Sequence, residues 1–461
     1  MYFKKTISLL LFSIAAFSGY SQDLSLKEAI NIGIDNYGYI KSKSKYASAS
    51  EETLKQTKRE YLPNLNLSAQ QSYGSVNGQY GSFYGMVGNV AASGPTLPEQ
   101  NWNAAFGAQY LSNVNWDFFT FGKTKEKINL EKMNVKIQVN DLEQEKFQLK
   151  IKISAAYLNL LASQRLLISQ QRNLDRAEVF LTTATARVRN GLQAGVDSTL
   201  ATAEVSKAKI ALNLARNMVK EQNNQLVDLM GVATQDFVAD TLFLSQIPTQ
   251  FLKDYSDTEG QHPTLKYFQT KVDYSEQQVK LSKRFYYPTM SLFGVLQSRA
   301  SGFGTNYSVD QSAFSRNYWD GINPDRTNFL IGAGISWNLT APFRMKKQVS
   351  AQKLIAQGVQ EEYNQVDREI KSQLSLADEK IKIALANYAE APTQVKAASQ
   401  AYLQKMTLYK NGLTTLTDLT QTMYILNRAE IDRDIVNSNV WQSFLIKVAA
   451  TGDFELFINE F

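Results

Sequence analysis

The hydrophobic and polar residues of this chain follow two periods, one typical of helices and one typical of strands. Between residues 123 and 190 there is neither glycine nor proline, and apolar residues recur at helical spacing, as at Ile153, Tyr157 and Leu160. An unbroken helix of this span would be about 100 Å long. Further helical stretches are predicted at 26–61, 198–230 and 345–410.

Glycine and proline mark where these helices end. Pro63 ends the first stretch, because the residue before a proline is disfavoured in the α region. Asn190 and Gly191 end the long second stretch. Gly358 and Pro392 fall inside the last one, so we expect that helix to be bent or broken near Pro392.

The predicted helices are longer than the three or four turns usual in a globular domain. Their surfaces are rich in Ala, Ser, Gln, Asn and Lys, with only narrow apolar stripes. This pattern suits a coiled-coil wall with water on one side. On the helices alone, a soluble helical bundle or rod is an equally good interpretation.

Four shorter segments are predicted to be strands. Residues 104–118 alternate between apolar and polar side chains, and residues 65–73 and 328–339 alternate in the same way. The segment at 289–298 is more apolar throughout, and its facing is unclear. A half-buried soluble sheet has the same period of two, so alternation by itself favours a membrane sheet only slightly.

The lengths of these segments match outer-membrane strands, which are apolar towards lipid and polar inside. Trp116 and Trp337 lie near strand ends and fit an aromatic girdle at the membrane interface. Four strands cannot close a bacterial barrel, and an open sheet edge in lipid would leave backbone groups unsatisfied. If these strands lie in a membrane, several chains must therefore pool them.

The same landmarks occur twice along the chain, in the same order. The segment around Pro63 resembles the one around Pro288, and the segment around Trp116 resembles, more weakly, the one around Trp337. A Gly-containing turn followed by an aspartate occurs as Asn190-Gly191-Leu192 with Asp197, and again as Asn411-Gly412-Leu413 with Asp418. We predict a duplication, with a first repeat at 22–243, a linker at 244–262 and a second repeat at 263–461.

Composition removes several classes of function. With 44% hydrophobic residues in 461, the chain is too apolar to be disordered. The net charge of +6 is small and its charges alternate, which does not favour nucleic-acid binding. Without cysteine and with His262 as the single histidine, a catalytic or metal constellation is improbable. We predict no enzyme activity, no cofactor and no metal, and we expect His262 to start a helix.

The amino terminus has the features of a secretory signal. Lys4 and Lys5 precede an apolar run at 7–17, and small residues lead up to a cleavage point before Gln22. As a membrane anchor the run is too short, because a spanning helix needs about 20 residues. We therefore predict a signal peptide at 1–21.

Taken together, the duplicated order of helix, strand, loop, strand, long helix and helix resembles the TolC-type outer-membrane efflux proteins over essentially the whole mature chain. The proline after the first helix and the Trp-containing strand leading to Gly122 belong to the resemblance, and the two hairpin tips at Gly191 and Gly412 are its most specific elements. It implies a mainly α fold with membrane β. Four strands per chain would pool into a trimeric twelve-stranded β-barrel, below which lies a long α-helical coiled-coil barrel.

The resemblance also implies a function and partners. The homotrimer would be a tunnel for export from the periplasm, or from an inner-membrane pump, to the exterior. Its hairpin tips would dock on a periplasmic adaptor (membrane fusion) protein, which itself binds the pump, and its barrel would contact outer-membrane lipid. The alternative is a soluble periplasmic coiled-coil scaffold, which would not float with the outer membrane.

Particular residues follow from the same comparison. The tips that would dock the adaptor are formed by Asn190, Gly191, Leu192, Asn411, Gly412 and Leu413. We expect Gly191 and Gly412 to adopt positive φ. Candidates for the pore constriction are Asp418, Gln421, Tyr409 and Asp197.

For each constriction candidate a structural role is open beside the functional one. Asp418 would form a carboxylate ring under threefold symmetry, or would only start the following helix. Asp197 is better interpreted as a helix-start residue, and Tyr409 fits a constriction and an ordinary interhelical contact equally well. Thr414 stands where the best-known member has an arginine that locks the closed state, so an arginine-based lock is not expected.

Overall fold

The structure is a computed structural model of the chain. It describes residues 22–78, 82–84, 90–92, 95–240, 246–249 and 262–460. The predicted signal peptide and most of the predicted linker lie outside these residues. The chain forms two compact units: unit 1 comprises Met1–Ala47, Gln138–Gln269 and Glu361–Phe461, and unit 2 comprises Ser48–Ile137 and Thr270–Gln360.

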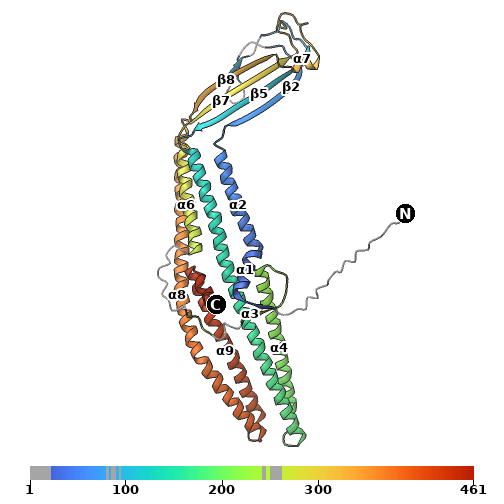
Figure 1. Ribbon diagram of the computed structural model, residues 1–461, viewed down its shortest axis with the longest axis vertical. Coiled ribbons are helices and arrows are strands. Elements are labelled where there is room, and N and C mark those ends of the chain that lie inside the picture. Colours follow the sequence, from blue (N-terminus) through green and yellow to red (C-terminus); the bar gives the residue numbers. More distant parts are fainter. Residues whose placement is uncertain are drawn as a thin grey trace, which may run out of the picture. The chain divides into compact units, whose positions relative to one another are not determined.

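Long helices make up most of the described chain, and in each half a helix is followed by two long strands and then by two long helices (Figure 1). The first half contains β1 (Gln22–Leu24), α1 (Leu26–Asn36), α2 (Gly38–Arg59), β2 (Asn64–Ser75), β3 (Ser82–Tyr84), β4 (Val90–Ala92), β5 (Ala104–Phe119), α3 (Lys123–Arg189), α4 (Gly195–Met230) and β6 (Phe237–Ala239). The second half contains α6 (Pro263–Arg284), β7 (Thr289–Ser301), α7 (Tyr318–Ile322), β8 (Arg326–Ser336), α8 (Ala341–Lys410), α9 (Leu416–Thr451) and α10 (Glu455–Ile458). Among the described residues, no helix is both long and apolar enough to cross a membrane.

The first predicted helix is interrupted, which the sequence pattern did not show. Tyr37 is extended, with φ −61° and ψ 117°, and separates α1 from α2. The break lies at a close tertiary contact. A Cβ on Gly231, which ends α4 at φ +65°, would lie 3.0 Å from the backbone of Asn36. The prediction of one continuous stretch at 26–61 is therefore wrong.

The opposite correction applies to the last long helix. The 70-residue α8 continues through Pro392, so the predicted break is wrong, while a bend there stays a prediction. Proline removes one backbone hydrogen bond, and its ring disturbs the turn before it. Pro392 is exposed, whereas Ala391 before it and Ala398 further along the helix are buried.

Unit 1 has two apolar clusters along its helices. The first surrounds the short parallel pair of β1 and β6, where Tyr157 is fully buried. The Tyr157 hydroxyl donates to the carbonyl of Leu24 (2.7 Å) and accepts from the amide of Asp240 (2.7 Å), which ties the two strands to α3. The second cluster joins α3, α4, α8 and α9 through side chains such as Phe180, Tyr409 and Leu419.

His262 lies at the start of α6, as predicted. The amide of Thr264 donates to its Nδ1 (3.1 Å), so the proton is on Nε2, which donates to the carbonyl of Ala449 (3.0 Å). Burial lowers the pKa of this histidine. Its ring leaves no space for a side chain at Gly452, where a Cβ would lie 2.7 Å from the Cα of His262.

Unit 2 contains the predicted strands as one antiparallel sheet in the order β2-β5-β7-β8. Paired residues share a face, so the register resolves the facing of β7. Leu292 pairs with Trp116 and Ala333, and Leu296 pairs with Phe329. The apolar face therefore extends over all four strands. Exposed side chains on it include Leu65, Leu67, Val114, Leu292, Leu296, Phe329, Ile331 and Ile335.

A loop helix covers part of this apolar face. Ile322 of α7 packs with Ala108 and Ala300, and the Tyr110 hydroxyl donates to the Ile322 carbonyl (3.1 Å). The ring of Tyr318 meets that of Phe106 edge to face. In the part of one chain that the structure describes, the rest of this face, towards the other strand end, is exposed.

Candidate functional site

The first hairpin tip joins α3 to α4 through a tight reversal. Gly191 has φ +70°, and its amide donates to the carbonyl of Val188 (3.0 Å). The amide of Leu192 donates to the carbonyl of Arg187 (2.9 Å). These bonds satisfy carbonyls that the end of a helix would otherwise leave free. Asn190 is exposed, and so is Leu192 (62%), an apolar side chain presented to solvent.

The second tip has the same geometry. Gly412 has φ +77°, which confirms the positive φ predicted for both glycines. The amides of Gly412 and Leu413 donate to the carbonyls of Tyr409 (3.0 Å) and Leu408 (2.9 Å). Asn411 is exposed, and Leu413 (71%) projects from this tip as Leu192 does from the first.

Arg187 and Tyr409 connect the two tips within one protomer. Arg187 of α3 donates through Nη1 to the carbonyl of Lys410 (2.8 Å), at the negative end of α8. Its guanidinium lies 5.5 Å from the centre of the Tyr409 ring. The Tyr409 hydroxyl donates to Oε1 of Gln193 (3.3 Å) in the first tip. Tyr409 is fully buried in this contact, and burial, followed by the charge of Asp197, raises its pKa.

Asp418 lies in the first turn of α9, where the helix dipole stabilises a carboxylate. Its amide donates to Oγ1 of Thr415 (3.2 Å), the residue that caps the helix. Its carboxylate accepts from Oγ1 of Thr414 (2.8 Å) and from Nζ of Lys405 (3.3 Å). The Thr414 hydrogen bond, and then Lys405, lower the pKa of Asp418. Thr414 thus holds the acid within the protomer.

The remaining two candidates lie nearby. Asp197 is half-buried in the first turn of α4, and its amide donates to the carbonyl of Ala194 (3.1 Å). Gln421 is exposed, one turn beyond Asp418, and lines a groove of about 590 Å³ between α3, α4 and α9. The structure thus brings Tyr409 and Asp197 together, and places Asp418 and Gln421 on successive turns of α9. Their role at a constriction stays a prediction.

Sequence reasoning missed the charged contacts between the hairpins. Arg176 of α3 forms a two-bond pair with Glu430 of α9, at 2.8 and 3.2 Å, and both side chains are largely buried. The hydrogen bond of Arg187 to Lys410 was also missed. Glu430 lies 254 residues after Arg176, and Lys410 lies 223 residues after Arg187, and no local sequence pattern marks such distant pairs.

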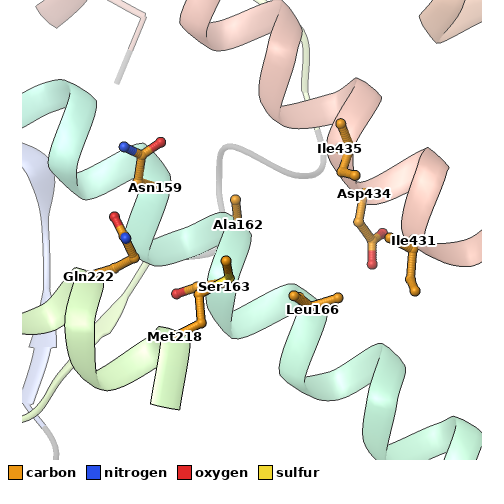
Figure 2. A pocket seen from close by; sticks show the side chains of 9 residues that line it. All are labelled: Asn159, Ala162, Ser163, Leu166, Met218, Gln222, Ile431, Asp434 and Ile435. Carbon is orange, nitrogen blue, oxygen red and sulfur yellow. The ribbon is translucent and has the colours of Figure 1, made fainter. Parts of the chain in front are cut away.

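Farther from the tips, α3, α4 and α9 line a cleft of about 400 Å³ (Figure 2). Its lining is mostly apolar, with Ser163 and Asn159 from α3, Gln222 from α4 and Asp434 from α9. Asp434 accepts from Ser169 (2.9 Å) and from Arg433 (2.8 Å), so its charge is already compensated. In the part of the chain that the structure describes, no three His, Cys, Asp or Glu side chains are grouped as a metal site.

The two predicted girdle tryptophans occupy matching positions in unit 2. The Trp116 indole donates to the carbonyl of Tyr61 (2.7 Å), and the Trp337 indole donates to the carbonyl of Tyr286 (3.1 Å). Both carbonyls lie two residues before the proline that precedes a strand. Trp337 lies just beyond β8 and is 54% exposed. The match supports the predicted duplication, and an interfacial role for both rings stays a prediction.

This architecture is that of solved outer-membrane channels. The Campylobacter jejuni CmeC outer membrane channel is similar over 93% of this chain and 85% of its own, with a TM-score of 0.73 and 15% identity. VceC from Vibrio cholerae is similar over 93% and 96%, with a TM-score of 0.71 and 16% identity. The open state of the Neisseria gonorrhoeae MtrE outer membrane channel matches over 94% and 90%, with a TM-score of 0.72 and 14% identity. At these identities the likeness defines the fold.

Part of the sequence matches a known family. Residues 39–232 match the family model of the outer membrane efflux proteins, and no curated protein sequence matches the chain. This match covers less than half of the chain, and it agrees with the predicted resemblance to the TolC-type outer-membrane efflux proteins. The family consists of transport channels and not of enzymes.

Proposed function

We propose that this chain is an outer-membrane channel subunit for efflux that extends into the periplasm, and not a soluble scaffold. Three copies would pool their sheets into a twelve-stranded barrel and their helices into a periplasmic tunnel. The observation that carries the proposal is the sheet order β2-β5-β7-β8, which leaves one hydrogen-bonding edge on β2 and another on β8. Backbone groups in lipid need partners, and an open edge does not supply them. Pairing β8 of one copy with β2 of the next removes every edge.

The two faces of the sheet support the same arrangement. Phe329 and Ile331 are about four-fifths exposed in the single chain, and together with Leu67 they would face lipid. Asn113 and Asn115 lie on the opposite face, paired with Asn66 and Asn64, and would face a water-filled interior. Apolar-out and polar-in is the alternation of outer-membrane barrels.

The hairpin tips are the proposed docking site for a periplasmic adaptor protein, through which an inner-membrane pump delivers its substrates. Leu192 and Leu413 support this role, because each exposes an apolar side chain on a turn held by backbone hydrogen bonds. We expect Leu192→Asp with Leu413→Asp to abolish adaptor crosslinking. Val309→Asp, in the loop after β7, should leave crosslinking unchanged, because Val309 is even more exposed than the two leucines but lies outside the tips. Unchanged crosslinking in the tip variant would reject these leucines as contacts.

Single-particle imaging of detergent-purified protein tests the assembly. We expect a threefold particle with a detergent belt and a tube longer than about 100 Å, the length of α3. A monomer that is soluble without detergent would refute the pooled barrel. In that case the apolar face would have to be covered within one chain. The channel itself contributes no chemistry in this proposal, and transport energy comes from the pump.

A further inference from the structure

Charge is almost absent from the sheet, and two of its few charged residues are paired with each other. The four strands β2, β5, β7 and β8 contain three charged residues: Asp117, Arg299 and Arg326. Arg299 of β7 and Arg326 of β8 are direct partners in the register. Like charges directly opposite each other destabilise a sheet, so this pair requires a compensating interaction.

The register also fixes the face on which the two arginines lie. Arg299 pairs with Gln109 of β5, and the next rung on the same face is Gln297 with Asn328. This is the polar face. The loop helix α7 packs on the opposite face, against Ala108. Both arginine side chains are exposed.

No acid among the described residues forms an ion pair with Arg299 or Arg326. Asp310 and Asp320 accept hydrogen bonds from Ser312 and Ser315, and Asp117 accepts one from Ser291 (2.6 Å). Asp325 touches the pair only through its amide, which donates to the carbonyl of Arg299 (3.0 Å). Among the described residues of unit 2, ion pairs are formed by other cations, for example Lys55, Lys127 and Arg284. The segment 79–94 contains no acidic residue.

We propose that Arg299 and Arg326 form a binding site for a phosphate or carboxylate group carried by the exported substrate. Two guanidinium groups side by side offer parallel N–H donors that match these planar or tetrahedral anions. In the proposed trimer, on which this inference rests, the site is repeated three times and forms a collar of guanidinium groups around the tunnel. Such a collar raises the local concentration of anionic substrates and disfavours cations.

The probe is inorganic pyrophosphate, first by calorimetry with the detergent-purified protein and then as a blocker of single-channel current. We expect binding and block that weaken with salt, and both to fall about tenfold or more in the double variant Arg299→Gln with Arg326→Gln. The control is Arg316→Gln, which removes the same charge type from a loop arginine that lies over the Phe314 ring (5.6 Å). The control should bind and block as the wild type does.

Each outcome decides the matter. Absent pyrophosphate binding, or equal loss in the control, overturns the site. Binding that depends on the pair without any block of the current overturns its place in the tunnel and indicates a phosphate at the lipid surface. A purified trimer that does not conduct ions refutes the proposed channel instead, and calorimetry still decides whether the arginines bind the anion.

Discussion

Replacing Arg187 with Gln should loosen the contact between the two hairpin tips. The change removes the charged hydrogen bond to the Lys410 carbonyl, which contributes about 1.5–3 kcal/mol. It also removes the stacking on Tyr409, about 0.5–1 kcal/mol. The arginine is half-buried, and its Nε is buried without a hydrogen-bond partner among the described residues, which offsets part of this gain. We therefore expect a net loss of about 2 kcal/mol, which lowers the ratio of docked to separated tips about 30-fold.

Thiol labelling measures this ratio, because the chain has no native cysteine. Met406 is 8% exposed in the apolar cluster that the docked hairpins share, so Met406→Cys should react with a maleimide only when they separate. We expect Arg187→Gln to speed the reaction about 30-fold, and Arg187→Lys to speed it less. The control is Arg189→Gln, an exposed arginine at the same tip.

Equal labelling rates in Arg187→Gln and Arg189→Gln would refute the reasoning. The contact would then be maintained by apolar packing around Tyr409, and the hydrogen bond to Lys410 would contribute nothing measurable. A large effect of Arg189→Gln as well would mean that net positive charge at the tip matters and the specific bond does not.

Three further predictions concern stability and the gate. The pKa of His262 is lowered from 6.5, so its contribution to stability is complete above about pH 6.5 and is lost as pH falls through the pKa of the folded state. His262→Gln should remove this decrease in the melting temperature at acid pH. Gly452→Ala should lower the free energy of unfolding more than Gly191→Ala does. Both positions have positive φ, which costs alanine about 1–2 kcal/mol, but only at Gly452 would the new Cβ clash with the backbone of His262. Equal melting temperatures of the two variants would contradict this. In planar bilayers, Asp418→Ala should weaken block by multivalent cations and Lys405→Gln should strengthen it, and unchanged block in both would reject a carboxylate ring.

The long elements were predictable because their periods are repeated many times. The bounds of α3 and of β2, β5 and β7 follow the sequence pattern closely, and the positive φ of Gly191 and Gly412 follows from a turn that only glycine enters without strain. Each of these features is local, and a local feature is visible in the order of residues along the chain.

What the sequence did not reveal depends on contacts between distant segments. Gly231 at the end of α4 lies against the backbone next to the break at Tyr37, and α8 continues through Pro392 although proline disfavours a helix interior. The apolar pattern of β5 correctly indicated an apolar face. It could not show that α7, more than 200 residues later, covers part of that face through Tyr110.

The two open edges of the sheet have a genetic consequence. In the proposed trimer every subunit pairs with both neighbours to close the barrel, so one subunit that cannot pair at β8 leaves the barrel of the whole trimer open. When normal and defective chains are made together, the fraction of sound channels falls as the cube of the normal fraction, and the loss exceeds that expected from gene dosage. An edge mutation in β2 or β8 should therefore be dominant, whereas a fault that prevents the chain from folding at all should be recessive.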